Sequence, residues 1–237
     1  MRRLGINIDH VATLRNARSE GHPDLLEIAK IVKKSGANSI TVHLREDRRH
    51  IKDYDLKKLC ERNFKINLEI AANTEMMNIA IKNNPNFVCL VPEKRNEITT
   101  EGGLDLIRNY KSIKKIITKL NKKGIRTSLF IDPSINNLIL SKKIGAKCVE
   151  LHTGKISRLI KNNKKYKKEF IKIKKCSQFG YKHNIEIHAG HGLDYKTTKI
   201  LSKISNITEF NIGHFIIGES IKIGISSVIQ KFIKIIK

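Results

Sequence analysis

The chain has 237 residues, of which 47 are Lys or Arg and 22 are Asp or Glu, giving a formal net charge of +25. No apolar run approaches the roughly 18 residues that a membrane-spanning helix needs, so a transmembrane protein is not expected. The four cysteines are scattered without the spacing of zinc ligands, which argues against a zinc-stabilised module and favours buried, reduced thiols.

The positive charge by itself suggests nucleic acid as a partner. However, many of the arginine residues lie in two short segments. The lysine residues are spread along stretches rich in Ile and Asn, and A/T-rich codons explain this composition without a partner. Aromatic residues make up only 5% and Trp is absent, which leaves few platforms for stacked bases. A basic nucleic-acid-binding protein therefore stays a remote alternative, and no specific nucleic acid or membrane partner is expected.

The first residues lead directly into an apolar run without a hydrophobic leader segment, so we expect a cytoplasmic protein. Eight such short runs recur along the chain, and each is followed by a polar residue and a helix-like stretch. Near-continuous apolar character is typical of parallel strands buried on both faces. The predicted strands span residues 4–8, 39–44, 66–71, 87–91, 127–131, 148–151, 185–187 and 210–212.

Amphipathic stretches between the runs predict helices with recognisable ends. One is predicted over 24–32, where Asp24 provides a start and Gly36 a stop. Others are predicted over 74–84, 134–144 and 216–237. A Lys-rich segment, 155–180, is expected to form a helix with an extra turn or a second helix, with most of its lysines in solvent rather than at an oligomer contact. Residues 92–103 are expected to form a polar loop.

Strand and helix alternating eight times is the pattern of a (β/α)8 barrel, and the length suits that fold, which runs to about 250 residues. A doubly wound sheet fits less well, because it usually has fewer strands and a glycine fingerprint after the first. No linker or break in composition divides the chain. We therefore predict an α/β protein with a single TIM-barrel domain, residues 1–237, and extra helical segments.

Polar residues gather at the predicted strand ends, where barrel enzymes carry their chemistry. Six of the nine histidines lie there. Histidines that converge at the mouth of a barrel indicate proton-transfer chemistry more than structural roles. The residues at these ends are Asn7, Asp9, His10, His43, Arg45, Glu69, Glu93, Asp132, Glu150, His152, His188, His191 and His214.

Arginines and glycines near the same strand ends predict phosphate binding. Arginines follow the first run within 15–18 and the second run within 45–49, and their forked donors match phosphate oxygens. After the last two runs, the glycines within 190–192 and 213–218 allow backbone N–H groups and a helix N-terminus to approach a phosphate.

The same strand ends leave two enzyme alternatives open. A metallo-hydrolase could use His43, Glu69 and His191 as ligands, although the HxH and HExxH spacings of such enzymes are missing. Another phosphosugar-handling TIM-barrel isomerase or aldolase would share the architecture. Such an enzyme would typically carry a Schiff-base lysine at a strand end, and none occurs at the predicted ends.

Several longer motifs run in order through almost the whole chain. They are GINIDHVATLRNAR (5–18), ITVHLREDRRHI (40–51), NLE (67–69), LVPEKR (90–95), TTEGGLD (99–105), SLFID (128–132), ELHTG (150–154), AGHGL (189–193) and NIGH (211–214). Together they resemble the pyridoxine 5'-phosphate synthase family, and the twelve-residue segment 40–51 alone is highly specific.

The resemblance implies a reaction in vitamin B6 biosynthesis. In this reaction 3-amino-2-oxopropyl phosphate condenses with 1-deoxy-D-xylulose 5-phosphate to form pyridoxine 5'-phosphate, inorganic phosphate and water. It implies a transferase-type ring-forming synthase with no metal and no organic cofactor, and a homo-octamer of barrels. Imine formation, eliminations and an aldol-like closure require several proton transfers.

The resemblance also implies residue roles. His43 and Glu69 correspond to general bases, His191 to the general acid, and Glu150 to a residue that stabilises a transition state. The residues that correspond to the aminoketone phosphate site are Asn7, Arg18, Gly192, Gly213 and His214. Those that correspond to the deoxyxylulose phosphate site are Asp9, His10, Arg45, His50 and Thr100. The segment 100–103 is expected to close over the substrates.

Three positions depart from the family pattern. His188 stands where Asn is expected, and Phe215 and Glu219 replace a small residue and an Arg around the last phosphate loop. An acid close to a bound phosphate would weaken binding by charge repulsion unless it points away. These departures bear on affinity more than on the type of reaction.

Overall fold

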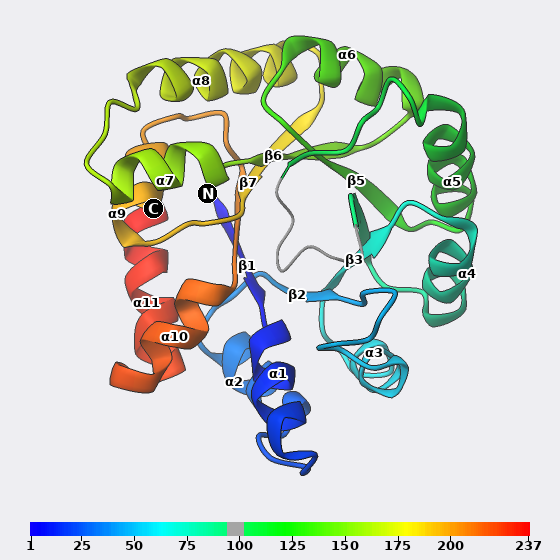
Figure 1. The fold of residues 1–237 in the computed structure, drawn as a ribbon, viewed down its shortest axis with the longest axis vertical. Coiled ribbons are helices and arrows are strands. Elements are labelled where there is room, and N and C mark those ends of the chain that lie inside the picture. The colour runs from blue at the N-terminus through cyan, green and yellow to red at the C-terminus, as the bar shows by residue number, and fades with distance from the viewer. Residues whose placement is uncertain (94–101) are drawn as a thin grey trace.

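Eight parallel strands form a closed barrel in the computed structural model, which describes residues 1–93 and 102–237 (Figure 1). Each strand pairs with the next one in the chain, and the last pairs with the first, so no strand edge is left unpaired. The predicted (β/α)8 barrel is confirmed. The strands are β1 (Arg3–Asn7), β2 (Ser39–His43), β3 (Ile66–Ala71), β4 (Phe87–Val91), β5 (Arg126–Ile131), β6 (Cys148–His152), β7 (Glu186–Gly190) and β8 (Glu209–Ile212).

All eight predicted strands occur, and the largest difference in their bounds is at β7. The apolar pattern predicts an end at residue 187, but the strand continues to Gly190. There His188 pairs with Glu150, and Gly190 pairs with His152, in the ladder to β6. Polar residues that face the inside of a barrel interrupt the apolar pattern without ending the strand, which explains the difference.

Helices cover the outside of the barrel (Figure 1). Some begin where the sequence predicts; the Asp24 carboxylate accepts hydrogen bonds from the N–H groups of Leu26 and Glu27 and caps α2. The helices within the described residues are α1 (Asp9–Arg18), α2 (Leu25–Lys34), α3 (Asp53–Cys60), α4 (Thr74–Asn83), α5 (Tyr110–Lys122), α6 (Ile135–Ile144), α7 (Gly154–Lys161), α8 (Lys167–Lys182), α9 (Tyr195–Leu201), α10 (His214–Ile223) and α11 (Ile225–Ile236).

Two of these helices correct the prediction of one long helix over 216–237. Gly224, with φ at +77°, lies between α10 and α11. Glycine reaches this left-handed region without the steric cost that a side chain brings, so it ends one helix and allows the next to start in a new direction. The Lys-rich segment 155–180 contains parts of two helices, α7 and α8, which confirms the alternative of a second helix.

Apolar side chains fill the layer between strands and helices, whereas the inside of the barrel is largely polar, apart from a small apolar cluster of Cys89, Val91 and Phe130. At the N-terminal ends of the strands, Arg3 Nε lies 2.6 Å from Glu209, Arg126 Nη2 lies 2.7 Å from Glu186, and His188 Nε2 also lies 2.7 Å from Glu186. Buried charges are tolerated when they are paired in this way. The network therefore closes the floor of the barrel with fixed charges.

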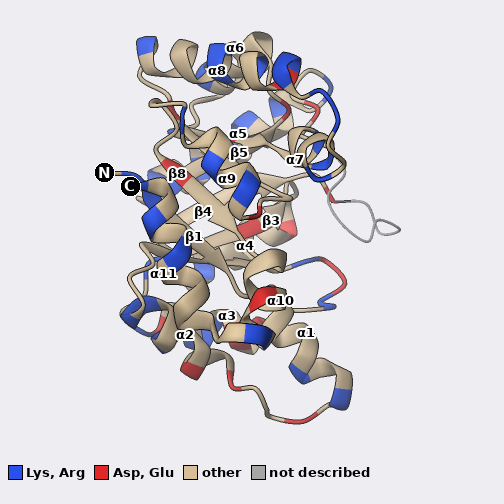
Figure 2. Ribbon diagram, turned by 90° about the vertical axis from the view of Figure 1, so that its left-hand side faces the viewer, with Lys and Arg blue, Asp and Glu red and all other residues tan. Residues whose placement is uncertain are grey.

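The outer surface carries the excess of positive charge. On the side shown in Figure 2, Lys and Arg are scattered over several helices and loops rather than gathered on one of them. Among residues 1–93 and 102–237, no helix is long and apolar enough to span a membrane. Cys89, Cys148 and Cys176 are buried free thiols and Cys60 is half-buried, as the sequence predicts.

A buried ion pair joins α1 to α3. The Arg15 guanidinium donates to both oxygens of Asp55, at 2.6 and 2.8 Å, and the two side chains are only 7% and 4% exposed. Asp55 also accepts from the N–H of Lys52 at 2.9 Å, just before α3 begins. One carboxylate thus holds the first helix against the segment that follows β2.

Removing this carboxylate charge should therefore destabilise the fold. We expect Asp55→Asn to lower the free energy of unfolding by about 3 kcal/mol, because Arg15 would stay buried without its partner. Asp53→Asn is the matched control, since Asp53 pairs with Arg48 in a largely exposed position and such pairs contribute about 1 kcal/mol or less. Urea unfolding measures both, and equal effects of the two variants would contradict the argument.

Candidate active site

A cavity of about 340 Å³ opens at the C-terminal ends of the barrel strands. All four predicted catalytic residues and eight of the ten predicted substrate-binding residues line it. They are His43, Glu69, Glu150 and His191, together with Asn7, Asp9, His10, Arg45, His50, Gly192, Gly213 and His214. The fold thus brings together side chains from strands that are far apart in the sequence.

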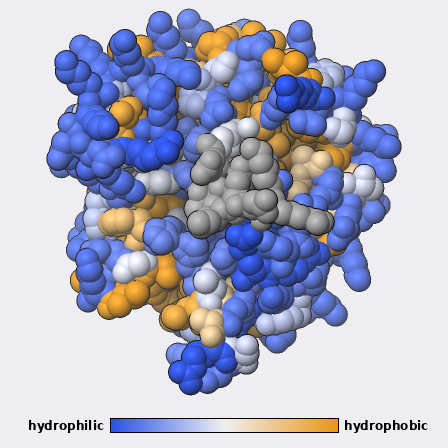
Figure 3. All heavy atoms as spheres, in the orientation of Figure 1, coloured by the Kyte–Doolittle hydropathy of each residue, from blue (hydrophilic) through white to orange (hydrophobic). Residues whose placement is uncertain are grey.

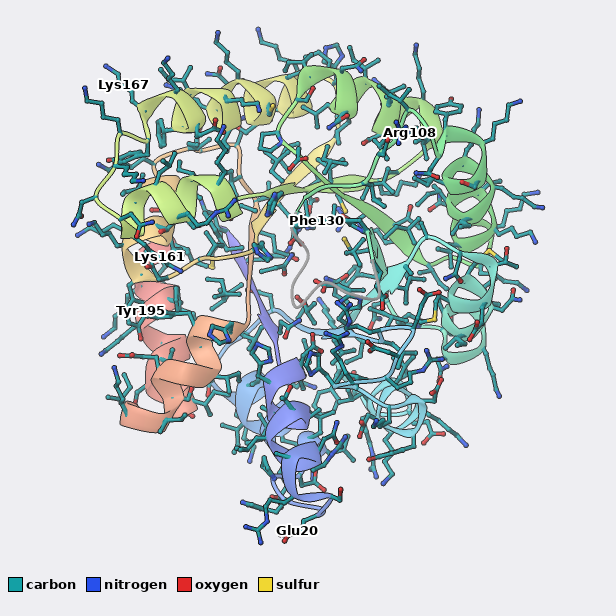
Figure 4. The ribbon with its side chains drawn as sticks, viewed as in Figure 1. Glu20, Arg108, Phe130, Lys161, Lys167 and Tyr195 are labelled. Atoms are coloured by element: carbon teal, nitrogen blue, oxygen red, sulfur yellow. The ribbon has the colours of Figure 1, made fainter. Side chains whose placement is uncertain are left out.

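The two remaining predicted residues have different positions. Arg18 is the last residue of α1; its side chain is 80% exposed, lies 3.6 Å from Glu20, and does not line the cavity. Figure 4 shows Glu20 at the outer tip of the molecule, far from Phe130 of the cavity wall. Thr100 and the first part of the expected closing segment lie outside the described residues. These roles stay predictions.

Asp9, at the start of α1, organises one wall of the cavity. Its carboxylate accepts hydrogen bonds from the backbone N–H of His43 at 2.8 Å and from Asn7 Nδ2 at 2.7 Å. Burial raises the pKa of Asp9, and the neighbouring His43 and these hydrogen bonds offset the effect only in part. Asp9 therefore links the ends of β1 and β2 and fixes the backbone from which the His43 ring projects.

His43 and Glu69 are neighbours in the ladder between β2 and β3. Nδ1 of His43 lies 3.9 Å from a carboxylate oxygen of Glu69. Burial, followed by the negative charges of Glu150 and Asp9, raises the pKa of Glu69 well above its usual value. A carboxyl group in these surroundings can hold a proton at neutral pH and give it up when a base or a cation approaches.

Glu150 lies deeper in the barrel, on β6. Its carboxylate accepts a hydrogen bond from Asn211 Nδ2 at 2.6 Å. Burial raises its pKa to about 7, although the charge of His188 and the bond from Asn211 act against the rise. A Cβ atom on Gly190 would lie 1.9 Å from the Glu150 carboxylate, so only glycine leaves room for this side chain. Glu150 is therefore placed and tuned to change protonation near neutral pH.

His191 follows β7 in the left-handed region, with φ at +78°. The Thr153 hydroxyl donates to the carbonyls of Gly190 and His191, both at 2.7 Å, which holds this backbone in place. The ring packs edge-on against His152, which pairs with Asp132 at 3.1 Å. Burial, and then the neighbouring His152 and cations of α7, lower the pKa of His191 to about 4, so the free enzyme holds this ring neutral.

A second group of imidazoles lines the opposite part of the cavity. The rings of His50 and His214 both meet His10 edge-on, at 5.6 and 4.9 Å between centroids. Thr13 Oγ1 lies 2.7 Å from His50 Nδ1 and supports that ring. Burial, followed by the nearby His10 and Arg45, lowers the pKa of His50 to about 4. The pKa of His10 is lowered as well, first by burial and then by His214.

Backbone N–H groups are available at the ends of β7 and β8. Gly192, at φ +75°, follows β7, and α10 begins directly after Gly213. A Cβ atom on Gly213 would lie 2.9 Å from the side chain of Asn7, so glycine is needed for the close approach of β8 and β1. The helix N-terminus and the glycine turns form a cradle that suits a phosphate.

Donor atoms suitable for a metal ion also meet in the cavity. Among the described residues, one atom each of Asp9, His43 and Glu69 lies within 4.8 Å of the others. The metal ligands considered from the sequence were His43, Glu69 and His191. In the structure, Asp9 and not His191 lies in this group with His43 and Glu69. Each Asp9 oxygen also accepts one hydrogen bond, from Asn7 Nδ2 or from the backbone N–H of His43.

Several wall residues were missed by sequence reasoning. They are Val91, Phe130, Lys161, Leu193, Asn211, Ile212 and Phe215. Lys161 comes from α7, and its Nζ donates to the carbonyl of Gly192 at 2.9 Å; no motif marks a helix residue of this kind. Asn211 lies within the matched NIGH segment, which could have identified it.

The departures from the family pattern have clear environments. His188 belongs to the charged floor, with Glu186 on one side and Glu209 on the other, at 2.7 and 3.6 Å. Phe215 packs against Tyr195 and Phe232 and contributes one wall of the cavity. Glu219 lies 3.6 Å from Lys222 and does not line the cavity, so its charge is directed away from the phosphate cradle.

Comparison with known proteins adds independent information. The family described as "Pyridoxal phosphate biosynthesis protein PdxJ" matches residues 4–237. A protein of Pelagibacter ubique (strain HTCC1062) named pyridoxine 5'-phosphate synthase is 65% identical over 98% of both chains. A protein of the same name from Ehrlichia chaffeensis is 48% identical, over 98% of this chain and 96% of that one.

Solved structures with much lower identity share the fold. The 3-keto-L-gulonate-6-phosphate decarboxylase of Vibrio cholerae has a TM-score of 0.69 at 11% identity, with 100% of this chain and 98% of that chain covered. The N-(5'-phosphoribosyl)anthranilate isomerase of Pyrococcus furiosus has a TM-score of 0.61 at 13% identity, with the same coverage. At such identities the likeness concerns the barrel alone.

The imidazoles of His50 and His191 should titrate with pKa values of about 4 in the substrate-free protein. NMR titration of the ring carbons measures these pKa values, and His50→Gln and His191→Gln identify the signals.

The low pKa values also affect stability, because the same imidazoles in the unfolded chain become protonated first on acidification, near pH 6.5. The stability that the neutral rings provide is therefore present above about pH 6.5 and is lost as the pH falls towards 4. A pKa near 6.5 for either ring would contradict the effect of burial.

Proposed function

The chain belongs to the PdxJ family of pyridoxal phosphate biosynthesis proteins, and we propose that two imidazoles and two carboxylates in its cavity carry out the proton transfers of the family's reaction. That reaction joins 3-amino-2-oxopropyl phosphate and 1-deoxy-D-xylulose 5-phosphate into pyridoxine 5'-phosphate, inorganic phosphate and water. The observation that carries the proposal is the convergence of His43, Glu69, Glu150 and His191 on one cavity.

His43 and Glu69 act as general bases in this proposal. Ring closure requires protons to leave carbon and nitrogen atoms of the joined substrates and to reach the oxygen atoms that leave as water. Burial raises the pKa of Glu69, which makes its ionised form a stronger base, and Nδ1 of His43 lies 3.9 Å away. A substrate atom that lies between the two groups can therefore give its proton to either of them.

His191 acts as the general acid once substrate is bound. Its ring is neutral in the free protein, because burial and neighbouring cations lower its pKa to about 4. A phosphate in the adjacent cradle at Gly192 brings negative charge, which raises the pKa of a nearby imidazole. Binding of the substrate thus raises the pKa of His191, so that the ring takes up the proton that it later donates.

Glu150, with a pKa of about 7, stabilises positive charge on an imine nitrogen.

Two phosphate positions follow from the wall of the cavity. The cradle at Gly192, Gly213 and His214, with Asn7, suits the aminoketone phosphate. Arg18 stays a prediction for this phosphate, because its exposed side chain does not line the cavity. The opposite group suits the deoxyxylulose phosphate, with Arg45 as its main cation and Asp9, His10 and His50 beside it in the cavity wall. Thr100 stays a prediction for this phosphate. Arg45 is buried, and two of its guanidinium nitrogens have no hydrogen-bond partner, which supports its assignment to an incoming anion.

We also propose that the chain assembles with copies of itself, as an octamer, in the cytoplasm. The apolar side chains of Leu14 and Ile221, on the packed helices α1 and α10, are 61% and 85% exposed. Figure 3 shows hydrophobic surface over this region of the molecule. Exposed apolar patches of this kind are typical of subunit contacts.

The activity test uses both phosphorylated ketones. EDTA-treated protein should form pyridoxine 5'-phosphate, detected by its absorbance, and release inorganic phosphate in step with it. No product at any protein concentration would exclude the proposed function. Product formation that depends strictly on added metal would exclude a cofactor-free mechanism in which His43 and Glu69 act by proton transfer alone.

The variants His43→Ala and Glu69→Gln should each lower turnover by about a hundredfold or more, because general bases contribute on the order of 10² to 10⁴ to rate. Urea unfolding should show that both variants remain folded. His183→Ala, in the exposed turn after α8, and Glu27→Gln, on the exposed side of α2, are matched controls and should keep wild-type turnover. Wild-type rates in His43→Ala and Glu69→Gln would remove their assignment as bases.

A further inference from the structure

Unpaired polar atoms gather beside the catalytic imidazole. Among the described residues, four buried side-chain atoms without a hydrogen-bond partner belong to one cluster: Nε2 of His43, Nε and Nη2 of Arg45, and Oε2 of Glu93. Buried polar atoms in folded proteins are nearly always paired, and exceptions mark sites that serve a function. His43 and Arg45 already have proposed roles, but Glu93 has none.

Glu93 lies two residues after β4, and its side chain is only 2% exposed. One of its carboxylate oxygens accepts a hydrogen bond from the N–H of Glu46 at 2.9 Å and lies 3.6 Å from Nε of Arg45. The other oxygen lies 3.5 Å from Nε2 of His43. A single carboxylate therefore faces both the proposed base and the main cation of the phosphate position.

The Glu93 carboxylate is ionised. Burial alone would raise its pKa, but the contact with His43, the N–H of Glu46 and the charge of Arg45 together lower it below the usual value. An ionised carboxylate offers acceptors and no donor. The nitrogen of His43 that faces Glu93 must then carry a hydrogen to form a favourable contact.

The other nitrogen of the ring has different surroundings. Nδ1 of His43 faces Glu69, at 3.9 Å, and both residues line the cavity. A neutral imidazole carries one hydrogen, so a hydrogen on Nε2 leaves the lone pair on Nδ1. The lone pair then points to the side on which the other base lies.

We propose that Glu93 is a positioning residue that holds His43 in the Nε2–H form, so that Nδ1 is the basic atom, and that ties this ring to Arg45. The inference rests on the proposed function in one respect, the role of His43 as a base. When Nδ1 takes a proton from the substrate, the ring becomes an imidazolium with Glu93 facing one N–H and Glu69 facing the other. No other reactant is required, because the proton simply moves from substrate to ring.

The test is the tautomer of His43 in the wild-type protein and in Glu93→Gln. Nitrogen-15 NMR of protein labelled at histidine distinguishes Nε2–H from Nδ1–H, and the signal missing from His43→Gln identifies the residue. We expect Nε2–H in the wild type. In Glu93→Gln the side-chain amide can donate to Nε2, so the Nδ1–H form should gain population and turnover should fall by about a hundredfold or more. Glu75→Gln, an exposed position on α4, should match the wild type in both measurements.

Several outcomes would overturn the proposal. A wild-type ring in the Nδ1–H form would do so without any variant, and this measurement remains available if Glu93→Gln fails to fold. An unchanged tautomer in folded Glu93→Gln, whatever its turnover, would show that Glu93 has only a structural role. If the wild type forms no pyridoxine 5'-phosphate, the proposed function fails, while the tautomer comparison still decides the role of Glu93.

Discussion

The burial of carboxyl groups inside a closed barrel is the constraint on which the rest of this site depends. The strands surround Glu69 and Glu150 on all sides, and burial is the largest cause of the raised pKa of each. Without this environment both groups would be permanently ionised at neutral pH and would exchange protons poorly. The charged floor of the barrel limits the effect, because His188 lies next to Glu150 in the ladder and its positive charge holds the Glu150 pKa near 7.

The free site holds neutral imidazoles and unpaired donors where the proposed substrates would place their phosphates. His50 and His191 are neutral, and Arg45 has donors without partners. Two incoming phosphates would satisfy these donors and raise the pKa of the neighbouring rings. In the proposed mechanism, substrate binding and proton uptake are therefore coupled through the same side chains.

The cavity holds these side chains because two glycines let the backbone approach them closely. Gly190 leaves space for the carboxylate of Glu150, and Gly213 leaves space for Asn7. Barrel proteins of other function share the overall fold at 11% or 13% identity. The difference in chemistry lies in the residues at the strand ends, which the common scaffold can carry in many combinations.

The amino-acid sequence by itself determined the barrel, because buried parallel strands impose an apolar pattern that can be read locally. It also indicated much of the cavity wall, since residues that follow each strand meet at one end of a barrel. Of the twelve predicted residues that line the cavity, nine stand at predicted strand ends, Gly192 and Gly213 come from the glycine loops, and His50 comes from the family resemblance alone. Only the tertiary structure placed Arg18 at an exposed helix end, divided the last helix at Gly224, and brought Glu93 to His43. These features depend on strand register, helix direction and contacts across the barrel mouth, which are properties of the closed fold and leave no periodic trace in the chain.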